Sequence, residues 1–482
     1  MPAACRAATV ITLAGEKAAR GRAALEAPLR IEDNAVILAE DGVILGVEPY
    51  AAFRRRAAAA FVFTDAGEVC LTPGLINAHC HLELSHTKGK CLAGKGFTPW
   101  LRSLAAALRT PCGTQEARAA AAKALDDADS SGTAHIGDVG SRLPGLVSEL
   151  AEGLLARRER EKGIRFPPGA LRAPARETRE LPEAPGVQGA REALELPGAQ
   201  EERVLPGARE AWEARPCAGG GSFRYPLTHF LELIGLNPPA PQNGAAWELR
   251  AGPWFLPASA ALPSRRFADC ALSGHALYST APEALQAAHA LCRRTGRIFC
   301  MHLAESPDED ECVRDGSGPL HALMAELLPA PTRARGTSPA VLAGKLGLLG
   351  PGTLVVHGVC LSSGDKRLLS GSGCSVCLCP RSNIFTAAGR AGPTAPEADG
   401  ILFCLGTDGL SSNTDVDMRR EAAAARDAYG LPARAVLRMA AVNGAAALGL
   451  NRLGTLEAGK AALVAVFDYR AAHKFSLQPT RA

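Results

Sequence analysis

The chain has 482 residues, of which 47% are hydrophobic and 21% are charged. This composition excludes a disordered protein, and a formal net charge of +4 gives no reason to expect a nucleic-acid partner. No apolar run approaches the roughly 20 residues that a membrane span needs, so we expect no membrane partner.

The 15 cysteines are an odd number and have no disulfide-scaffold spacing. Many lie in apolar, strand-like runs such as "GCSVCLCP" (373–380), where Cys377 and Cys379 are interpreted as packing residues rather than metal ligands. The start of the chain lacks the pattern of a secretory signal. Reduced, buried thiols and no signal together predict a cytoplasmic protein.

Both ends of the chain have the pattern of small β regions. Residues 1–70 alternate short β-like runs with polar turns, including a hairpin signal at Asp41-Gly42, and residues 451–482 look the same. We therefore expect one small β domain that is assembled from both termini.

Residues 71–450 alternate apolar, strand-like runs with helical runs. The helical pattern at 282–295, for example, leads into the strand-like "GRIFCMHLAES" at 296–306. Repeated strand–helix alternation predicts a parallel sheet, and at this length a closed (β/α)₈ barrel. An Arg/Glu/Ala/Pro/Gly-rich stretch at about 155–222 interrupts the pattern. We interpret it as a low-complexity insertion, with a partner-binding segment as the alternative.

The stretch "LTPGLINAHCHLELSHTKGK" (71–90) poses the question of function. Side chains alternate along a strand, so His79 and His81 point to one side and Cys80 to the other. A pair of histidines at the end of a buried strand suggests metal ligands, although two hydrogen-bonded histidines would give the same pattern.

Three more polar residues decide between these readings. His302, His357 and Asp408 each lie where a strand-like run ends. In a (β/α)₈ barrel the carboxyl ends of all strands meet at one mouth. Unpaired polar groups near a core cost about 2–7 kcal/mol. Convergence of these side chains therefore predicts a metal site rather than core packing.

An ordered series of motifs supports this prediction: "PGLINAHCH", "HLAES", "VVHGVC", "CPRSN", "LGTDGLSSN" and "VNGAAALGL". The series resembles the amidohydrolase superfamily, in particular its cytosine deaminase, S-adenosylhomocysteine deaminase and chlorohydrolase branch, over most of the chain outside the insertion. The resemblance implies a distorted (β/α)₈ barrel with a β-sandwich built from both termini. The domains would be 1–70 and 451–482 for the sandwich and 71–450 for the barrel.

The resemblance also implies a set of site residues. The metal ligands would be His79, His81, His302 and Asp408, with Asp408 also a catalytic proton acceptor. Glu305 would be the proton shuttle, and His357 would lie beside the metal-bound water. Cys80 stands where the family usually has Thr, but it faces away from the metal.

A single divalent ion, Zn²⁺ or Fe²⁺, suits three imidazoles and a carboxylate. Two-metal members of the superfamily use a carboxylated lysine on the fourth strand. The matching region "RFADCALSGHALYS" (266–279) has no lysine, which favours one metal.

The chemistry expected from the resemblance is hydrolytic removal of an exocyclic amine from a nucleobase or nucleoside, a small-molecule substrate. His275, Trp100 and Arg381 are candidate substrate-binding residues. Each has an alternative role: His275 could pack in the core or support the metal ligands from behind, Trp100 could pack in the core, and Arg381 could form a surface ion pair. The S-adenosylhomocysteine deaminases have a ribose-binding Glu just before the Trp, where this chain has Pro99.

"HLELS" followed by "GFTPWL" resembles the branch that deaminates aminodeoxyfutalosine on a menaquinone route, which is our single best substrate prediction. Alternatives within the superfamily are S-adenosylhomocysteine or methylthioadenosine, guanine, cytosine and chlorotriazines. An inactive scaffold with a binding role is the alternative outside enzymes, although no ligand is lost here. Analogy with the fold suggests a homodimer.

Overall fold

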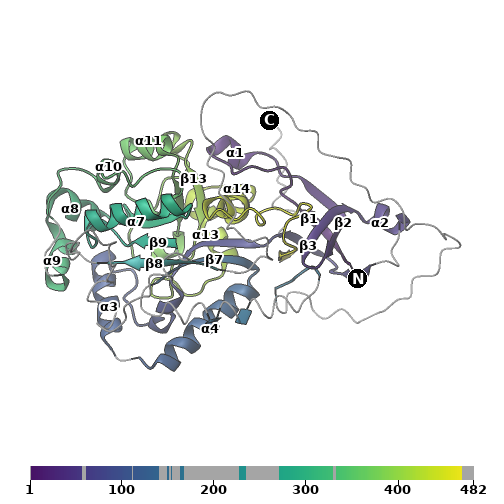
Figure 1. Cartoon of the computed structure of the whole chain (residues 1–482), viewed down its shortest axis with the longest axis horizontal. Helices are drawn as coiled ribbons and strands as arrows, with labels where there is room; N and C mark the ends of the chain where they lie inside the picture. Colours follow the sequence, from purple (N-terminus) through teal and green to yellow (C-terminus); the bar gives the residue numbers. More distant parts are fainter. Residues whose placement is uncertain are drawn as a thin grey trace.

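The computed structural model describes residues 2–56, 61–110, 112–140, 149–150, 153–154, 163–167, 227–234, 271–328 and 333–468. These residues form two sheets, and helices surround the larger one (Figure 1). Within the described residues, no helix has the length and apolar character to cross a membrane.

The larger sheet has eight parallel strands that follow one another in chain order. They are β6 (Leu75–Cys80), β7 (Thr133–Gly140), β8 (Leu227–Leu233), β9 (Ala271–Gly274), β10 (Phe299–Leu303), β11 (Thr353–His357), β12 (Ser375–Leu378) and β13 (Leu402–Leu405). Most of their residues are buried, as expected for parallel strands that are covered on both faces. The order and direction of the strands confirm the predicted (β/α)₈ barrel.

Helices connect successive strands or cover the ends of the barrel. The longer ones are α3 (Phe97–Arg109), α4 (Thr114–Ser130), α7 (Pro282–Thr295), α8 (Pro307–Asp315), α9 (Gly318–Leu327), α11 (Ser363–Ser372) and α13 (Met418–Tyr429). Shorter ones are α1 (Arg22–Glu26), α2 (Tyr50–Arg56), η2 (Leu82–Thr87), α10 (Pro339–Lys345), α12 (Pro380–Phe385), η3 (Pro396–Ala398), α14 (Ala433–Arg438), η4 (Met439–Asn443) and α15 (Gly444–Ala447). The bounds of α7 are those predicted, because Pro282 opens the helix and Gly296, with φ 67°, ends it.

The barrel closes between its first and last strands through a seam, formed by Asn77 and His79 of β6 and by Thr407 and Asp408 after β13. The Asn77 amide donates to the Thr407 hydroxyl at 2.7 Å and accepts from the Thr407 N–H at 3.0 Å. The Asp408 N–H donates to the His79 carbonyl at 3.1 Å. The contacts that close the barrel therefore include two predicted site residues.

The smaller sheet contains strands from both ends of the chain, which confirms that part of the fold prediction. Its strands are β1 (Ala3–Ile11), β2 (Ile31–Glu40), β3 (Val43–Pro49), β4 (Val62–Asp65), β5 (Val69–Pro73) and β14 (Val464–Asp468), and β14 pairs antiparallel with β5. The predicted hairpin joins β2 to β3. Asp41 and Gly42 have φ values of 49° and 75°, the left-handed backbone that a two-residue hairpin turn requires.

The predicted insertion at 155–222 lies outside the described residues except for 163–167. In this short piece, Arg165 forms a β-bridge with Leu463 and a buried ion pair with Asp129 at 2.6 Å. Residues 163–167 are thus tied to both α4 and the chain next to β14. Because β5 continues to Pro73, the first sheet also extends slightly beyond the proposed boundary at residue 70.

The contact between β6 and β7 gives a stability prediction. A Cβ atom at Gly137 would lie 2.4 Å from the Ala78 carbonyl oxygen, whereas one at Gly371 in α11 would meet no atom within 4 Å. We expect Gly137→Ala to destabilise the protein by about 1–3 kcal/mol, and Gly371→Ala to stabilise it by up to about 1 kcal/mol. Denaturant midpoints of the two variants would measure this, and a Gly137→Ala protein as stable as the parent would contradict it.

Candidate active site

Four predicted ligands meet at the carboxyl end of the barrel. His79 lies in β6 and His81 directly follows that strand, His302 lies in β10, and Asp408 follows β13. All four are buried. Cys80, between the first two, packs in a separate apolar cluster, as strand alternation predicts.

Four separations between the ligating atoms are similar. The Nε2 atom of His302 lies 3.3 Å from Nε2 of His79 and 3.4 Å from Nε2 of His81. The Oδ1 atom of Asp408 lies 3.5 Å from Nε2 of both His79 and His81. Atoms that bind one ion tetrahedrally at 2.0–2.1 Å are about 3.3 Å apart. The four donors therefore fit a single divalent metal ion.

Hydrogen bonds orient two of the imidazoles for this role. Nδ1 of His81 lies 3.0 Å from the Val139 carbonyl, and Nδ1 of His302 lies 3.0 Å from the His275 carbonyl. An Nδ1–H that donates to a carbonyl leaves the Nε2 lone pair directed at the ion.

Burial lowers the pKa values of His79 and His302, which keeps both rings neutral. For His81, burial is outweighed by the carboxylates of Asp408 and Glu232, which raise its pKa. Metal binding at His81 therefore competes with protonation, so metal affinity falls as the pH falls.

The Asp408 carboxylate is fixed on both sides. Its Oδ1 faces the imidazoles, and its Oδ2 accepts hydrogen bonds from Ser382 at 2.7 Å and Ser412 at 2.6 Å. Burial alone would raise the pKa of Asp408, but the hydrogen bond with His79 and the neighbouring His81 and His357 hold it well below its usual range. The group is therefore ionised over the physiological range.

Backbone strain is concentrated at these strand ends. His357 and Asp408 have φ values of 74° and 55°, in the left-handed region that non-glycine residues rarely adopt. Each such residue costs on the order of 1–3 kcal/mol and persists only where the surroundings enforce it. At both positions the turn directs a polar side chain into the mouth of the barrel.

Glu305 and His357 form a buried pair beside the ligands. Oε1 of Glu305 lies 3.4 Å from Nε2 of His357, whose Nδ1 lies 3.0 Å from Oδ1 of Asn383. Burial, with Asp408 and Glu309 nearby, raises the pKa of Glu305 well above its usual range. Burial lowers the pKa of His357 to about 4. A protonated carboxyl thus faces a neutral imidazole.

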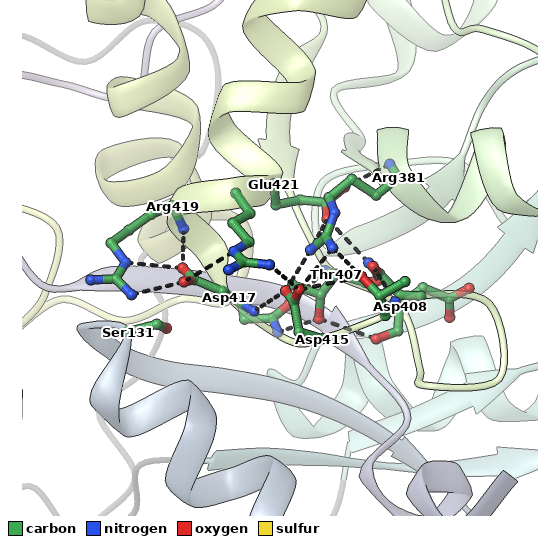
Figure 2. A network of polar contacts seen from close by, with 12 residues as sticks. Ser131, Arg381, Thr407, Asp408, Asp415, Asp417, Arg419 and Glu421 are labelled. Carbon is green, nitrogen blue, oxygen red and sulfur yellow. Dashed lines mark hydrogen bonds and ion pairs between the residues drawn. The ribbon is translucent and has the colours of Figure 1, made fainter. Parts of the chain in front are cut away.

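Arg381 forms an ion pair, the alternative role considered for it. Its guanidinium makes two hydrogen bonds to Asp415, at 2.6 and 2.9 Å, and it does not line the cavity described below. Its backbone N–H donates to Glu421 at 3.0 Å. Figure 2 shows this network beside Asp408.

The same network supports the loop that carries Asp408. The Asn413 amide donates to the Thr407 carbonyl at 2.7 Å and lies 3.3 Å from the Glu421 carboxyl. Glu421 is completely buried, and burial raises its pKa to about 8. Arg381 therefore acts on the site through the loop rather than by direct contact.

A cavity with about 1200 Å³ of empty space, part of it open to solvent, is lined by three of the four ligands, His81, His302 and Asp408. His275 and Trp100 line it, as predicted for substrate-binding residues. Nδ1 of His275 lies 2.5 Å from the Ser279 hydroxyl, and burial lowers the pKa of its ring to about 3. Trp100 is also part of the core, and its indole N–H donates to the Ser411 carbonyl at 2.9 Å.

One wall of the cavity is apolar. It comes from α3 and from the end of α9, and consists of Phe97, Trp100, Leu101, Leu104, Ala105, Leu108, Met324, Leu327 and Leu328. The lining also includes the acids Glu83 and Glu232. The cavity therefore suits a ligand with both apolar and polar parts.

Two buried acids at the barrel mouth were not predicted. Asp138, near the end of β7, accepts a hydrogen bond from the Leu82 N–H at 2.8 Å and so fixes the chain after His81. Glu232, near the end of β8, lines the cavity. His302 and Asp408 were predicted because each is a polar residue at the end of a strand-like run, and Asp138 and Glu232 have the same position. The run that carries Glu232, "LTHFLEL", is not among the strands predicted from the sequence.

Comparison with known proteins is consistent with this geometry. Residues 264–481 match the model of the amidohydrolase family. A 5-methylthioadenosine/S-adenosylhomocysteine deaminase from Pelotomaculum thermopropionicum is 33% identical over 207 residues, 41% of this chain and 44% of the relative. One of the same name from Halobacterium salinarum is 41% identical over 148 residues, 29% and 34% of the two chains. The chain thus spans less than half the length of these relatives.

Solved structures share the fold over nearly the whole chain. The Helicobacter pylori aminofutalosine deaminase in complex with methylthio-coformycin has a TM-score of 0.67 and 18% identity, and the alignment covers 99% of this chain and 97% of that chain. A zinc-bound adenosine deaminase from Xanthomonas campestris has a TM-score of 0.62 and 18% identity, with 99% and 87% covered. At these identities the likeness concerns the fold alone.

The serines behind Asp408 give a prediction about metal binding. Ser412→Ala removes one of the two hydroxyl donors to Oδ2 of Asp408, so the carboxylate is less well oriented. We expect the affinity for a divalent ion to fall about tenfold. Competition with a chelator would measure it, with Ser363→Ala on the exposed start of α11 as control. Equal affinities in the two variants would contradict the assignment.

Proposed function

We propose that this protein is a single-metal aminohydrolase of the amidohydrolase family that replaces an exocyclic amine on a nucleobase or nucleoside ring by oxygen and releases ammonia. The observation that carries the proposal is the buried Glu305–His357 pair, held beside three imidazoles and a carboxylate in one cavity. Ionisable groups with opposed pKa shifts in a single cavity are typical of acid–base catalysis.

The proposed ligands are His79, His81, His302 and Asp408, and the ion is Zn²⁺ or Fe²⁺. Both ions suit imidazole and carboxylate donors. In β9, the fourth strand of the barrel, no lysine is present to bridge a second ion. When bound, a divalent ion in such a site lowers the pKa of water towards neutrality.

The chain's own residues supply the proton transfers. Glu305, protonated in its buried setting, gives its proton to a ring nitrogen and so makes the adjacent carbon electrophilic. Asp408, ionised, accepts a proton from the attacking water, and His357 holds the attacking oxygen by a hydrogen bond. Glu305 then takes the proton of the new hydroxyl and passes it to the amine, which leaves as ammonia while the C=O bond forms. The proton held by Asp408 returns to Glu305, so one water is consumed and both carboxyl groups regain their starting states.

The substrate we propose first is an adenine nucleoside of the aminodeoxyfutalosine type. The mixed cavity supports it, because a purine over the ligands would leave a substituent to lie along the apolar wall of α3 and α9. The relatives' names favour 5-methylthioadenosine or S-adenosylhomocysteine as the second candidate. Guanine, cytosine and chlorotriazine remain alternatives that share the same ligands.

The other sequence-based expectations stay predictions. They are the cytoplasmic location, the homodimer and the absence of nucleic-acid and membrane partners. The non-enzymatic alternative, a scaffold with a binding role, is less well supported, since the full set of predicted ligands converges.

Glu305→Gln tests the proposed proton shuttle. The amide keeps the size of the side chain but cannot transfer a proton, so we expect ammonia release to fall by about 10²–10⁴-fold with metal content unchanged. Ammonia release from adenosine, aminodeoxyfutalosine, methylthioadenosine, guanine and cytosine would be measured beside metal analysis. Glu311→Gln on the exposed side of α8 is the control. A metal-loaded parent protein that releases no ammonia from the panel would refute the function.

Removal of metal tests its identity and its role. We expect a chelator to abolish ammonia release and one equivalent of the native ion to restore it, because the proposed ligands converge on one site. Zn²⁺ and anaerobic Fe²⁺ would be added separately. Activity that persists in metal-free protein would argue against the proposed chemistry.

A further inference from the structure

Glu232 is a buried acid in the cavity that the proposed chemistry does not use. It is the next-to-last residue of β8, the third barrel strand, and only 7% of its surface is exposed. Its carboxyl oxygen and the ring nitrogens of His275 and His302 all lie within 4.8 Å of one another. The side chain therefore lies close to the proposed ligand His302.

One oxygen of this carboxyl lacks a partner. Oε1 of Glu232 is buried and makes no hydrogen bond with the described residues. A buried acceptor without a donor costs about 1–3 kcal/mol, and such groups call for a specific explanation. In a cavity wall, the simplest explanation is a hydrogen-bond donor that arrives with the ligand.

The surroundings of Glu232 narrow the kind of ligand. Glu83 lines the same part of the cavity, and Asp408 and Asp138 also act on Glu232 electrostatically. Several acids on one wall repel an anionic group and favour N–H or O–H donors. The part of the substrate that meets this wall is thus neutral or cationic.

The proposed substrate class identifies the donor. An adenine substituted at N9 has one N–H donor group, the exocyclic amine, and the reaction removes it at the metal site. The donors that remain on the nucleoside are the hydroxyls of its ribose. We infer that Glu232 is a specificity-determining residue that accepts a hydrogen bond from a ribose hydroxyl of the substrate; the inference rests on the proposed function.

This contact is tested by combining variants that lack the Glu232 carboxylate with substrates that lack one ribose hydroxyl. The rates of ammonia release from adenosine, 2′-deoxyadenosine and 3′-deoxyadenosine would be measured for the metal-loaded parent protein, Glu232→Leu and Glu232→Gln. Glu326→Gln, which changes an exposed carboxylate on α9 outside the cavity, is the matched control. Metal content and melting temperature would be recorded for each protein.

In the parent protein, we expect loss of one of the two hydroxyls to lower kcat/KM by about 10–100-fold, as for a hydrogen bond to a charged group. In Glu232→Leu, adenosine should already be slow, and loss of that hydroxyl should cost less than about threefold, because its partner is gone. Glu232→Gln keeps one acceptor oxygen and should lie between the two. Glu326→Gln should behave as the parent.

The outcomes separate the inference from the proposed function. Suppose that the parent protein deaminates adenosine and that removing a hydroxyl lowers kcat/KM equally in the parent and in Glu232→Leu. This result overturns the role of Glu232 and leaves the proposed function standing. Loss of metal from Glu232→Leu assigns the residue to support of the ligands and also overturns the inference. A metal-loaded parent that releases ammonia from no adenine nucleoside overturns both.

Discussion

The close approach of three imidazole nitrogens and a carboxylate oxygen, with four separations of 3.3–3.5 Å, is the constraint around which this barrel is built. Like polar atoms do not stay together in a buried space unless a cation or hydrogen bonds compensate. Hydrogen bonds supply part of the compensation: two serines hold Asp408, and backbone carbonyls hold His81 and His302. The left-handed backbone of His357 and Asp408 is a further cost that the surrounding structure bears.

Four carboxyl groups line the cavity, and the environments of three of them separate their properties. Asp408 lies among imidazoles and stays ionised, whereas burial beside other acids raises the pKa of Glu305. Glu232 lies between these cases, since burial raises its pKa to about 7 although His81 opposes the shift. Similar side chains thus acquire different proposed roles, as acid, base and substrate contact, from what each one touches.

Much of this arrangement could be predicted from the sequence, because strand alternation places His79 with His81, and barrel topology brings distant strand ends together. His302 and Asp408 follow from that rule. Glu232 did not, since its strand stands next to the Arg/Pro-rich stretch, where no helical pattern marks the alternation. For Arg381 the sequence could not identify the partner. The sequence places a charged residue after a strand, but only the structure shows that its guanidinium pairs with Asp415.

The seam between β6 and β13 has a thermodynamic consequence. A barrel sheet is usually closed by a regular backbone ladder, but here the closing contacts include side-chain bonds between Asn77 and Thr407 and one backbone bond from Asp408 to His79. An ion bound by His79 and Asp408 would bridge the first and last strands directly. Ligand occupancy and barrel closure would then be linked equilibria, so that the free energy of ion binding adds to the free energy of unfolding.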